Sequence, residues 1–311
     1  MSVEKRNRII GTILLLITAL IWGTSFVAQS NAMDHIGPLT MNGVRTLVAA
    51  VFLLFVSLVF DKVKGKKITL LGTTDKKEKR YVLFAGLVCG LSVTLASTIQ
   101  QFGIQYTTVG KSGFLTTLYV VFTPLFALFL GRKIKWNGWV AAVLALVGMF
   151  FICIEKNEPL NVGDLLIIIS SVFFGVQMVA VDKFVFRVDP IKLSLLQQSV
   201  CAVCCLVGAF IFEEVNIHTI LDATWPIIYA GLFSAGIAYT LQIVAQKWVA
   251  PNIAPLIMCL ESVFALFSGA IIKHEKMSPQ VYFGCGLVFI GIVLAQISFK
   301  SRKEKNELIR K

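Results

Sequence analysis

Two charged residues lie deep inside long apolar stretches of this 311-residue chain. Arg45 is seven residues into the stretch 38–60, and Glu261 is ten residues into the stretch 251–272. A guanidinium keeps its charge, so Arg45 needs a carboxylate, carbonyl oxygens or an aqueous cavity, and it could bind a carboxylate ligand through two parallel hydrogen bonds. A carboxyl group at this depth must be neutral, paired or open to water, so Glu261 is a candidate for binding a cation or a proton. The structural alternatives are that Arg45 pairs with Glu261, or that Glu261 ties its helix to a neighbour.

Glutamine is frequent within the apolar stretches, although an amide that faces lipid is costly. Two pairs have the i, i+4 spacing that places both side chains on one helix face. The nine residues are Gln29, Gln100, Gln101, Gln105, Gln177, Gln197, Gln198, Gln242 and Gln246. We expect these amides to face the inside of a helix bundle, where they either line a polar cavity or hydrogen-bond one helix to another.

Three aromatic residues lie inside the same stretches and are candidates either for packing or for cation–π contact with an ammonium group. The predicted binding residues are therefore Trp22, Arg45, Gln101, Tyr119, Gln177, Gln197, Tyr239, Gln242 and Glu261. Lys111 is a gate candidate, although a lysine near the end of an apolar stretch can also extend to the membrane interface. Asp164 and Lys192 each lie two residues from a predicted helix start, where a cap-like role is expected.

The elements that carry these residues are long and apolar. The chain is 57% hydrophobic and 15% charged, whereas soluble domains are about 45–50% apolar and about 25% charged. The ten apolar stretches are 9–32, 38–60, 81–106, 110–130, 136–154, 162–181, 190–212, 225–246, 251–272 and 279–299. They contain only five of the 46 charged residues. Each is long enough to cross about 30 Å of hydrocarbon as a helix, and their continuous apolar character excludes a membrane barrel.

Basic residues lie almost only in alternate connections between these stretches. If the N-terminus is cytoplasmic, 24 Lys and Arg face the cytoplasm, and only Lys111, Lys156, Lys273 and Lys276 face the other side. The positive-inside rule therefore predicts that both termini are cytoplasmic. The net charge of +12 then reflects topology and contact with anionic lipids, and does not indicate nucleic-acid binding.

The two halves of the chain resemble each other. At a shift of 152 residues, Trp22, Gly23 and Pro38 fall on Phe174, Gly175 and Pro190. Farther along, a shift of 143 places Gly148 on Gly291. Such self-similarity over about 130 residues indicates an internal repeat.

Each half holds five apolar stretches, so the second half must enter the membrane from the opposite face. The sequence predicts two inverted five-helix units, residues 1–154 and 155–311, a common construction in transporters. Because residues 9–32 match 162–181, we expect them to be a retained first helix and not a cleaved signal peptide.

The residues that match between the halves also resemble the drug/metabolite transporter superfamily, specifically its ten-helix EamA-type proteins. The matching pieces are Ala19-Leu-Ile-Trp22-Gly23, Pro38-Leu-Thr with Arg45, Leu130-Gly131-Arg132 with Gly148, Cys259-Leu-Glu261-Ser262-Val-Phe264, and Lys273-His274-Glu275 with Gly291. Ser262 stands where that family usually has proline, and a proline would loosen the helix there. Arg132 stands where Glu275 has its counterpart. The resemblance implies that helices 1–4 and 6–9 surround a central cavity and that helices 5 and 10 lie at the periphery.

The resemblance and the polar residues together predict an all-α membrane protein of the inner membrane that transports a small amphipathic, amino-acid-like metabolite by alternating access. We expect export, with proton coupling as a hypothesis that rests on Glu261. The alternatives are efflux of cationic aromatic drugs, a channel, and a membrane-embedded lipid-binding protein. Without a Walker sequence, a nucleophile elbow or zinc spacing, we expect neither an enzyme nor a cofactor. The expected partners are a small-molecule substrate and anionic lipids, with the chain a monomer or a homodimer.

Overall fold

The computed structural model describes residues 3–65, 69–129, 131, 136–153, 161–249, 253–274 and 278–296. Within these ranges the chain forms helices and no strand. The expectation of an all-α membrane protein is therefore confirmed. The predicted cytoplasmic tail, Arg132 and Glu275 lie outside the described residues.

Eight helical spans in the described part of the chain are long and apolar enough to cross a membrane. Those that are single helices are α1 (Val3–Ala32), α2 (Pro38–Val63), α3 (Lys76–Ile104), α7 (Val162–Phe184) and α8 (Pro190–Phe212). The composite spans are α4 (Val109–Thr116) with α5 (Tyr119–Phe129), α10 (Thr224–Tyr229) with η1 (Ala230–Ala238) and α11 (Tyr239–Ala245), and α12 (Ala254–Met258) with α13 (Leu260–Ile272). The fifth and tenth predicted spans correspond to α6 (Trp136–Cys153) and α14 (Pro279–Gln296), and a short α9 (Ile217–Asp222) precedes α10.

Three of the long helices, α2, α7 and α8, begin at residues that remove or satisfy free N–H groups. Pro38 and Pro190 occupy the first turns of α2 and α8, where a missing N–H has no cost. Asn161 and Asp164 form a reciprocal capping box at the start of α7, which confirms the expected cap-like role of Asp164.

Two equivalent helices are interrupted near their middles. Thr117 and Leu118 separate α4 from α5, and Cys259 separates α12 from α13. The shift of 143 residues brings these two interruptions to within two residues of each other. The break beside Glu261 therefore forms without the family's usual proline. The hydroxyl of Ser262 donates to the carbonyl of Cys259 at 2.7 Å, which satisfies a carbonyl oxygen at the break.

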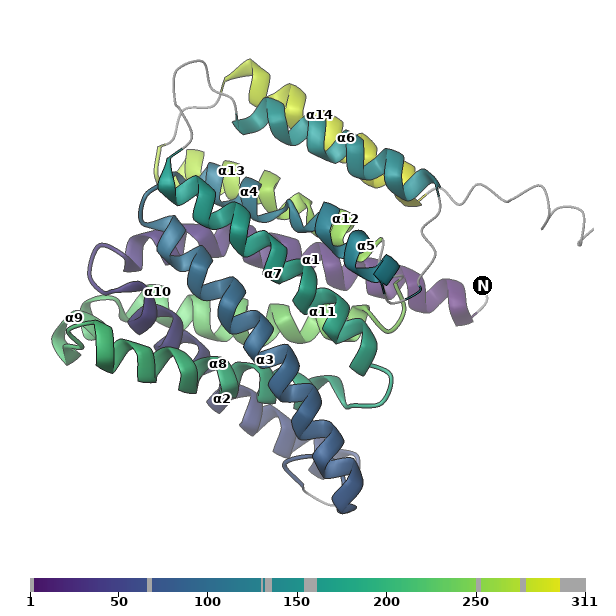
Figure 1. Cartoon of the computed structure of the whole chain (residues 1–311), viewed down its shortest axis with the longest axis vertical. Coiled ribbons are helices and arrows are strands. Elements are labelled where there is room, and N and C mark those ends of the chain that lie inside the picture. The colour runs from purple at the N-terminus through teal and green to yellow at the C-terminus, as the bar shows by residue number, and fades with distance from the viewer. Residues whose placement is uncertain are drawn as a thin grey trace, which may run out of the picture.

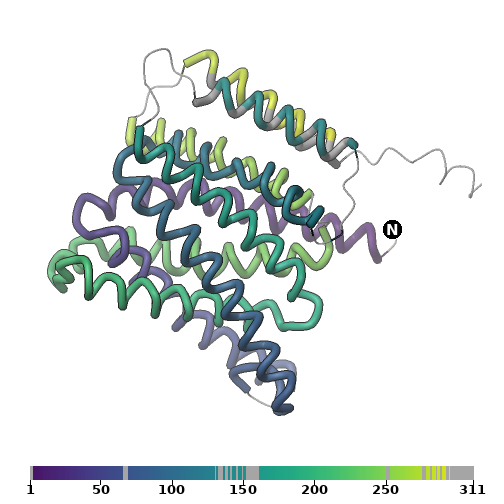
Figure 2. Tube along the Cα trace, in the orientation of Figure 1, coloured from purple at the N-terminus to yellow at the C-terminus, as the bar shows by residue number. Residues whose placement is uncertain are grey.

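The helices pack in pairs, and the internal repeat maps each pair either onto itself or onto another pair. α2 packs against α8, its own counterpart, and α6 packs against α14 in the same way. α3 packs against α7, just as α1 packs against η1 and α11. In Figure 2 segments of the first half of the chain, purple to teal, lie beside green to yellow segments of the second half. This is the arrangement expected of an inverted repeat.

The α6–α14 pair forms a separate layer along one edge of the molecule (Figure 1). The other spans enclose the interior, where the buried charged and amide side chains lie. The peripheral position that the family resemblance implies for helices 5 and 10 agrees with this arrangement.

Gly23 and Gly175, which the repeat aligns, allow close helix crossings. A Cβ atom on Gly23 would lie 2.5 Å from Phe264 Cβ and 2.7 Å from the carbonyl oxygen of Glu261. A Cβ atom on Gly175 would lie 2.9 Å from Phe122 Cβ. Each glycine thus brings α1 or α7 against the second segment of an interrupted helix, α13 or α5.

The ends of α2 and α8 are joined at both faces of the bundle. At one face, Lys192 Nζ lies 2.6 Å from Asp61 Oδ2, and both side chains are nearly buried. At the other face, Glu213 accepts hydrogen bonds from the main-chain N–H groups of Leu39 and Thr40, each at 2.8 Å. Asp61 and Glu213 are related by the shift of 152. The repeat therefore places an acid at the end of each central helix, against the first turn of its partner.

Candidate functional site

A small cavity lies in the bundle, between spans from both halves of the chain. Its volume is about 30 Å³. Its lining residues are Trp22, Phe26, Gln29, Arg45, Gln100, Thr116, Tyr119, Phe174, Met178, Ser234, Tyr239 and Glu261. The cavity holds water-sized molecules only, since sites for small organic ligands are about 300–1,000 Å³. The helices that surround it must separate before a metabolite can enter.

Arg45 of α2 lies at this cavity and is almost fully buried. Its Nη1 donates to Gln29 Oε1 at 2.7 Å, and its Nε donates to Asn42 Oδ1 at 3.0 Å. Neither partner is a carboxylate, so two neutral amides hold the guanidinium while its charge is not neutralised by an ion pair within the described residues. The amide of Asn42 in turn donates to Ser97 Oγ at 2.9 Å, which fixes its orientation.

Glu261 lies in the first turn of α13, just after the helix break, and is 3% exposed. Tyr119, the first residue of the equivalent segment α5, donates its hydroxyl to Glu261 Oε2 at 3.2 Å. A side-chain hydrogen bond therefore links the two interrupted helices at this point. No ion pair between Arg45 and Glu261 is recorded among the described residues, so the predicted pairing is absent from this conformation.

Trp22 of α1 and Tyr239 of α11 form an aromatic wall of the cavity. Their ring centroids are 4.8 Å apart in an edge-to-face arrangement. Trp22 Nε1 donates to the carbonyl of Ser234 at 3.2 Å, and Thr18 donates to the carbonyl of Ala238 at 3.3 Å. Both carbonyls belong to η1, a π-helical segment, and such segments are frequent at functional sites because they alter the backbone hydrogen bonding.

Four predicted binding residues do not line the cavity. They are Gln101, Gln177, Gln197 and Gln242. Gln177 Nε2 donates to Gln197 Oε1 at 3.0 Å, and Gln242 Nε2 donates to Gln177 Oε1 at 3.3 Å, so three helices are linked by amides. Both polar side-chain atoms of buried Gln101 lack a hydrogen-bond partner among the residues that the structure describes. In this conformation the three linked glutamines connect helices, and their predicted role in binding stays a prediction.

The cavity also contains residues that the sequence analysis did not propose for binding. Phe174 and Met178 of α7 are the repeat counterparts of Trp22 and Phe26, which are likewise cavity residues. The shift of 152 residues could therefore have identified them once Trp22 was proposed. No comparable signal distinguishes Gln100, which donates to Thr116 Oγ1 at 2.8 Å, from its neighbour Gln101.

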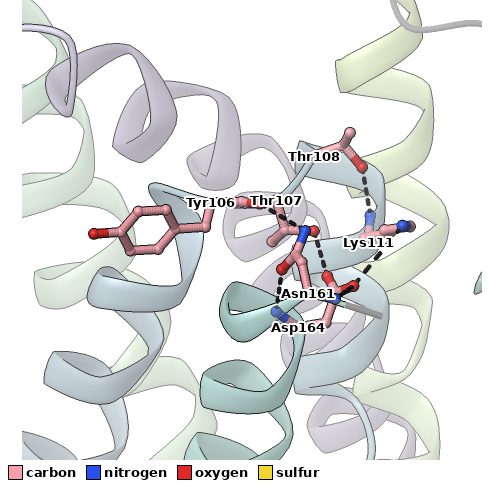
Figure 3. A network of polar contacts seen from close by, with 6 residues as sticks. All are labelled: Tyr106, Thr107, Thr108, Lys111, Asn161 and Asp164. Atoms are coloured by element: carbon pink, nitrogen blue, oxygen red, sulfur yellow. Dashed lines mark hydrogen bonds and ion pairs between the residues drawn. The ribbon is translucent and has the colours of Figure 1, made fainter. Parts of the chain in front are cut away.

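A second polar cluster lies at the end of the bundle where α7 begins (Figure 3). Lys111 Nζ is 3.8 Å from Asp164 Oδ2, and the Asp164 side chain is fully buried. Thr107 donates to Asp164 Oδ1 at 2.5 Å, and Asn161 Nδ2 donates to the carbonyl of Tyr106 at 2.8 Å. The cluster joins the connection between α3 and α4 to the start of α7. Lys111 is thus paired across an inter-half contact, and its predicted role as a gate stays a prediction.

Comparison with known proteins identifies the architecture. The sequence model of the EamA-like transporter family matches residues 9–154 and 161–296. An uncharacterized transporter of Archaeoglobus fulgidus is 27% identical over 94% of this chain and 88% of its own length. The uncharacterized transporter YoaV of Bacillus subtilis is 26% identical over 91% of this chain and 96% of its own length.

Two more distant likenesses agree. The uncharacterized inner membrane transporter YedA of Escherichia coli is 22% identical over 89% of this chain and 88% of its own length. A solved crystal structure superposes with a TM-score of 0.72 at 16% identity and covers 92% of this chain and 96% of that one, which supports the fold. The division of the chain at residues 154 and 155 stays a prediction. Since the family match spans nearly the whole chain, the protein belongs to the EamA-like transporter family and is a multi-pass membrane transporter, not an enzyme.

Proposed function

We propose that the protein is a secondary carrier for a small zwitterionic metabolite of the amino-acid type. The observation that carries this proposal is that Arg45 and Glu261, two buried residues of opposite charge, line one cavity without pairing with each other. Arg45 can bind a carboxylate through two hydrogen bonds, and ionised Glu261 can bind an ammonium group. One ligand that carries both groups would satisfy both side chains at once.

The rest of the lining fits an amphipathic ligand. Trp22, Phe174 and Tyr239 supply apolar and aromatic surface, while Gln29 and Gln100 supply amides. Gln29 is already the partner of Arg45. A bound carboxylate would therefore either share the guanidinium with Gln29 or displace it.

The mechanism that we propose is alternating access between the two inverted halves. The small cavity is lined by residues of both halves, and both interrupted helices contribute to it, through Tyr119 and Glu261. Interrupted helices near a midplane site are typical of transporters whose halves rock about that site. The helix breaks provide places at which the halves can move without breaking a continuous hydrogen-bond ladder.

We further propose export across the inner membrane, with both termini in the cytoplasm and proton coupling through Glu261. The inner-membrane location is supported by the likeness to YedA, which is named an inner membrane transporter. The orientation is supported by the 24 basic residues on one side against four on the other. Glu261 is the only carboxyl among the described lining residues. The family resemblance is what supports export as the proposed direction.

The test is substrate flux in liposomes that contain the purified protein. Purified protein is first screened against metabolites for a rise in melting temperature, and flux of each hit is then measured. We expect Arg45→Gln to lower the flux of a zwitterion at least tenfold, because it removes the proposed bidentate hydrogen bonds between the guanidinium and the carboxylate of the ligand. The surface variant Lys64→Gln serves as the matched control. Unchanged flux in Arg45→Gln would contradict the proposed carboxylate site.

Glu261→Gln tests coupling separately from binding. We expect this variant to lose the response of flux to a pH gradient, because glutamine cannot release a proton. Unchanged transport and pH dependence would remove Glu261 from the mechanism. Competition by a lipophilic aromatic cation, without binding of zwitterions, would favour drug efflux instead, and single-channel currents in a bilayer would overturn the carrier mechanism.

A further inference from the structure

A large apolar groove on the outside of the bundle lies apart from the central cavity. Its volume is about 720 Å³, within the range of about 300–1,000 Å³ of sites that hold small organic ligands. The walls come from Val51 and Leu54 of α2, Leu83 of α3, and Leu195 and Leu196 of α8. Val51 is 61% exposed, so the groove opens toward the surface that faces the membrane.

The groove has the length of one bilayer leaflet. Its lining reaches Ala50 in the middle of α2, and at the opposite end it reaches Thr69, which Lys192 joins to Asp61 near the end of α2. Ala50 and Asp61 are eleven residues apart along the helix. At a rise of 1.5 Å per residue this distance is about 16 Å, and half of a hydrocarbon core of about 30 Å is about 15 Å. The groove therefore runs from the membrane edge, where α2 ends and α3 begins, to about the midplane.

The end of the groove at the membrane edge is built by the connection between α2 and α3. Thr69, Leu70 and Leu71 line it. Lys192 holds this segment in place, since its Nζ donates to the carbonyl of Thr69 while it pairs with Asp61. This wall of the groove, residues 69–71, is therefore joined to the start of α8 through Lys192.

The groove is basic where it reaches the membrane edge. Lys79 is part of its lining and is only partly exposed. The segment 61–80 carries eight Lys and Arg against three acids. Of these acids, Asp61 is paired with Lys192, and Glu78 accepts a hydrogen bond from Thr73, another lining residue. The positive charge therefore predominates at the level of lipid headgroups, which attracts anionic lipids.

We propose that this groove binds one anionic phospholipid, with an acyl chain along α2, α3 and α8 and the phosphate at Lys79. The apolar walls and leaflet-length extent fit the chain, and the basic end fits the headgroup. The bound lipid would contact the loop that Lys192 holds and would join α2, α3 and α8. This site does not depend on the identity of the transported substrate.

Native mass spectrometry of the purified full-length protein, titrated with phosphatidylglycerol or phosphatidylcholine, tests the proposal. We expect the first phosphatidylglycerol to bind more tightly than phosphatidylcholine. Lys79→Gln should weaken phosphatidylglycerol binding about fivefold, since one lysine near the membrane surface contributes on the order of 1 kcal/mol. Lys64→Gln, in the same basic segment but outside the lining, should change it less than twofold.

Filling the groove tests the acyl-chain part. Val51→Trp should remove tight binding of both lipids, whereas Val203→Trp, at an equally exposed position of α8 outside the groove, should leave it unchanged. Leu83→Trp is a second filling variant if the first does not fold. Equal losses in Lys79→Gln and Lys64→Gln would indicate only diffuse surface attraction. Unchanged binding in both filling variants, or equal affinity for the two lipids, would overturn the site.

Discussion

The Asp61–Lys192 ion pair should couple the stability of α2 to that of α8. The two charged atoms are 2.6 Å apart, and the side chains are 10% and 4% exposed. Removing one partner of a buried pair costs about 3–5 kcal/mol, because the other charge is left without compensation. The pair lies at a helix end near the membrane edge, so we expect the lower end of this range. Asp61→Asn should therefore destabilise the protein by about 3 kcal/mol and lower its melting temperature by about 6 °C.

A double-mutant cycle measures the coupling directly. Lys192→Met removes the ammonium that Asp61→Asn leaves unpaired, so the double variant should lose less than the sum of the single losses. Thermal unfolding of purified protein in one detergent gives all four values. The exposed pair of Lys273 with Asp34, at 4.0 Å, is the matched control, for which we expect about 0–1 kcal/mol. Additive losses in the buried cycle, within about 0.5 kcal/mol, would refute the reasoning.

Three other substitutions test separate features of the packing and the cavity. Glu213→Gln should lower the free energy of unfolding by about 1–2 kcal/mol in thermal unfolding, since it removes a carboxylate that caps the start of α2. The neighbouring variant Glu214→Gln should lower it by less than about 0.5 kcal/mol. Equal losses of stability in the two variants would contradict the cap. Gly23→Ala should lower both the melting temperature and the flux, because the added Cβ would lie 2.7 Å from the main chain of α13. Gly208→Ala, whose added Cβ would have its nearest atom at 3.5 Å, should behave almost as the wild type. Wild-type stability and flux in the Gly23→Ala variant would argue against the close crossing. Tyr119→Phe should change the flux in liposomes and its pH dependence more than it changes the melting temperature, since it removes only the hydroxyl that donates to Glu261. A large loss of stability with normal flux would assign that hydroxyl a structural role.

The sequence was sufficient for the architecture because the physical constraints on a membrane-spanning chain are strong. Lipid cannot hydrogen-bond an exposed backbone, so long apolar runs must be helices. Charges avoid the hydrocarbon, so the few that remain inside it indicate the interior. The same reasoning identified Arg45 and Glu261 as residues to examine, and both lie at the cavity. The repeat alignment of Gly23 with Gly175 corresponds to equivalent helix crossings.

Only the tertiary structure decided which polar side chains meet. The i, i+4 spacing places two glutamines on one helix face but does not say which face is turned to the cavity. Successive residues on a helix point about 100° apart, which is why Gln100 lines the cavity and its neighbour Gln101 does not. The partners of Arg45 are Gln29 and Asn42 instead of the acid that sequence reasoning could suggest, because pairing depends on how separate helices cross.

The helix ends also differ in what the sequence predicted and what only the tertiary structure showed. The sequence predicted that Asp164 and Lys192 lie at helix starts, since helix termini have local signals in charge and capping residues. It contained no signal that Lys192 would pair with Asp61 or that Lys111 would face Asp164, because these partners are far apart along the chain. Local patterns determined the helices and the position of each charge along its helix. The helix packing alone determined the contacts between charges on different helices.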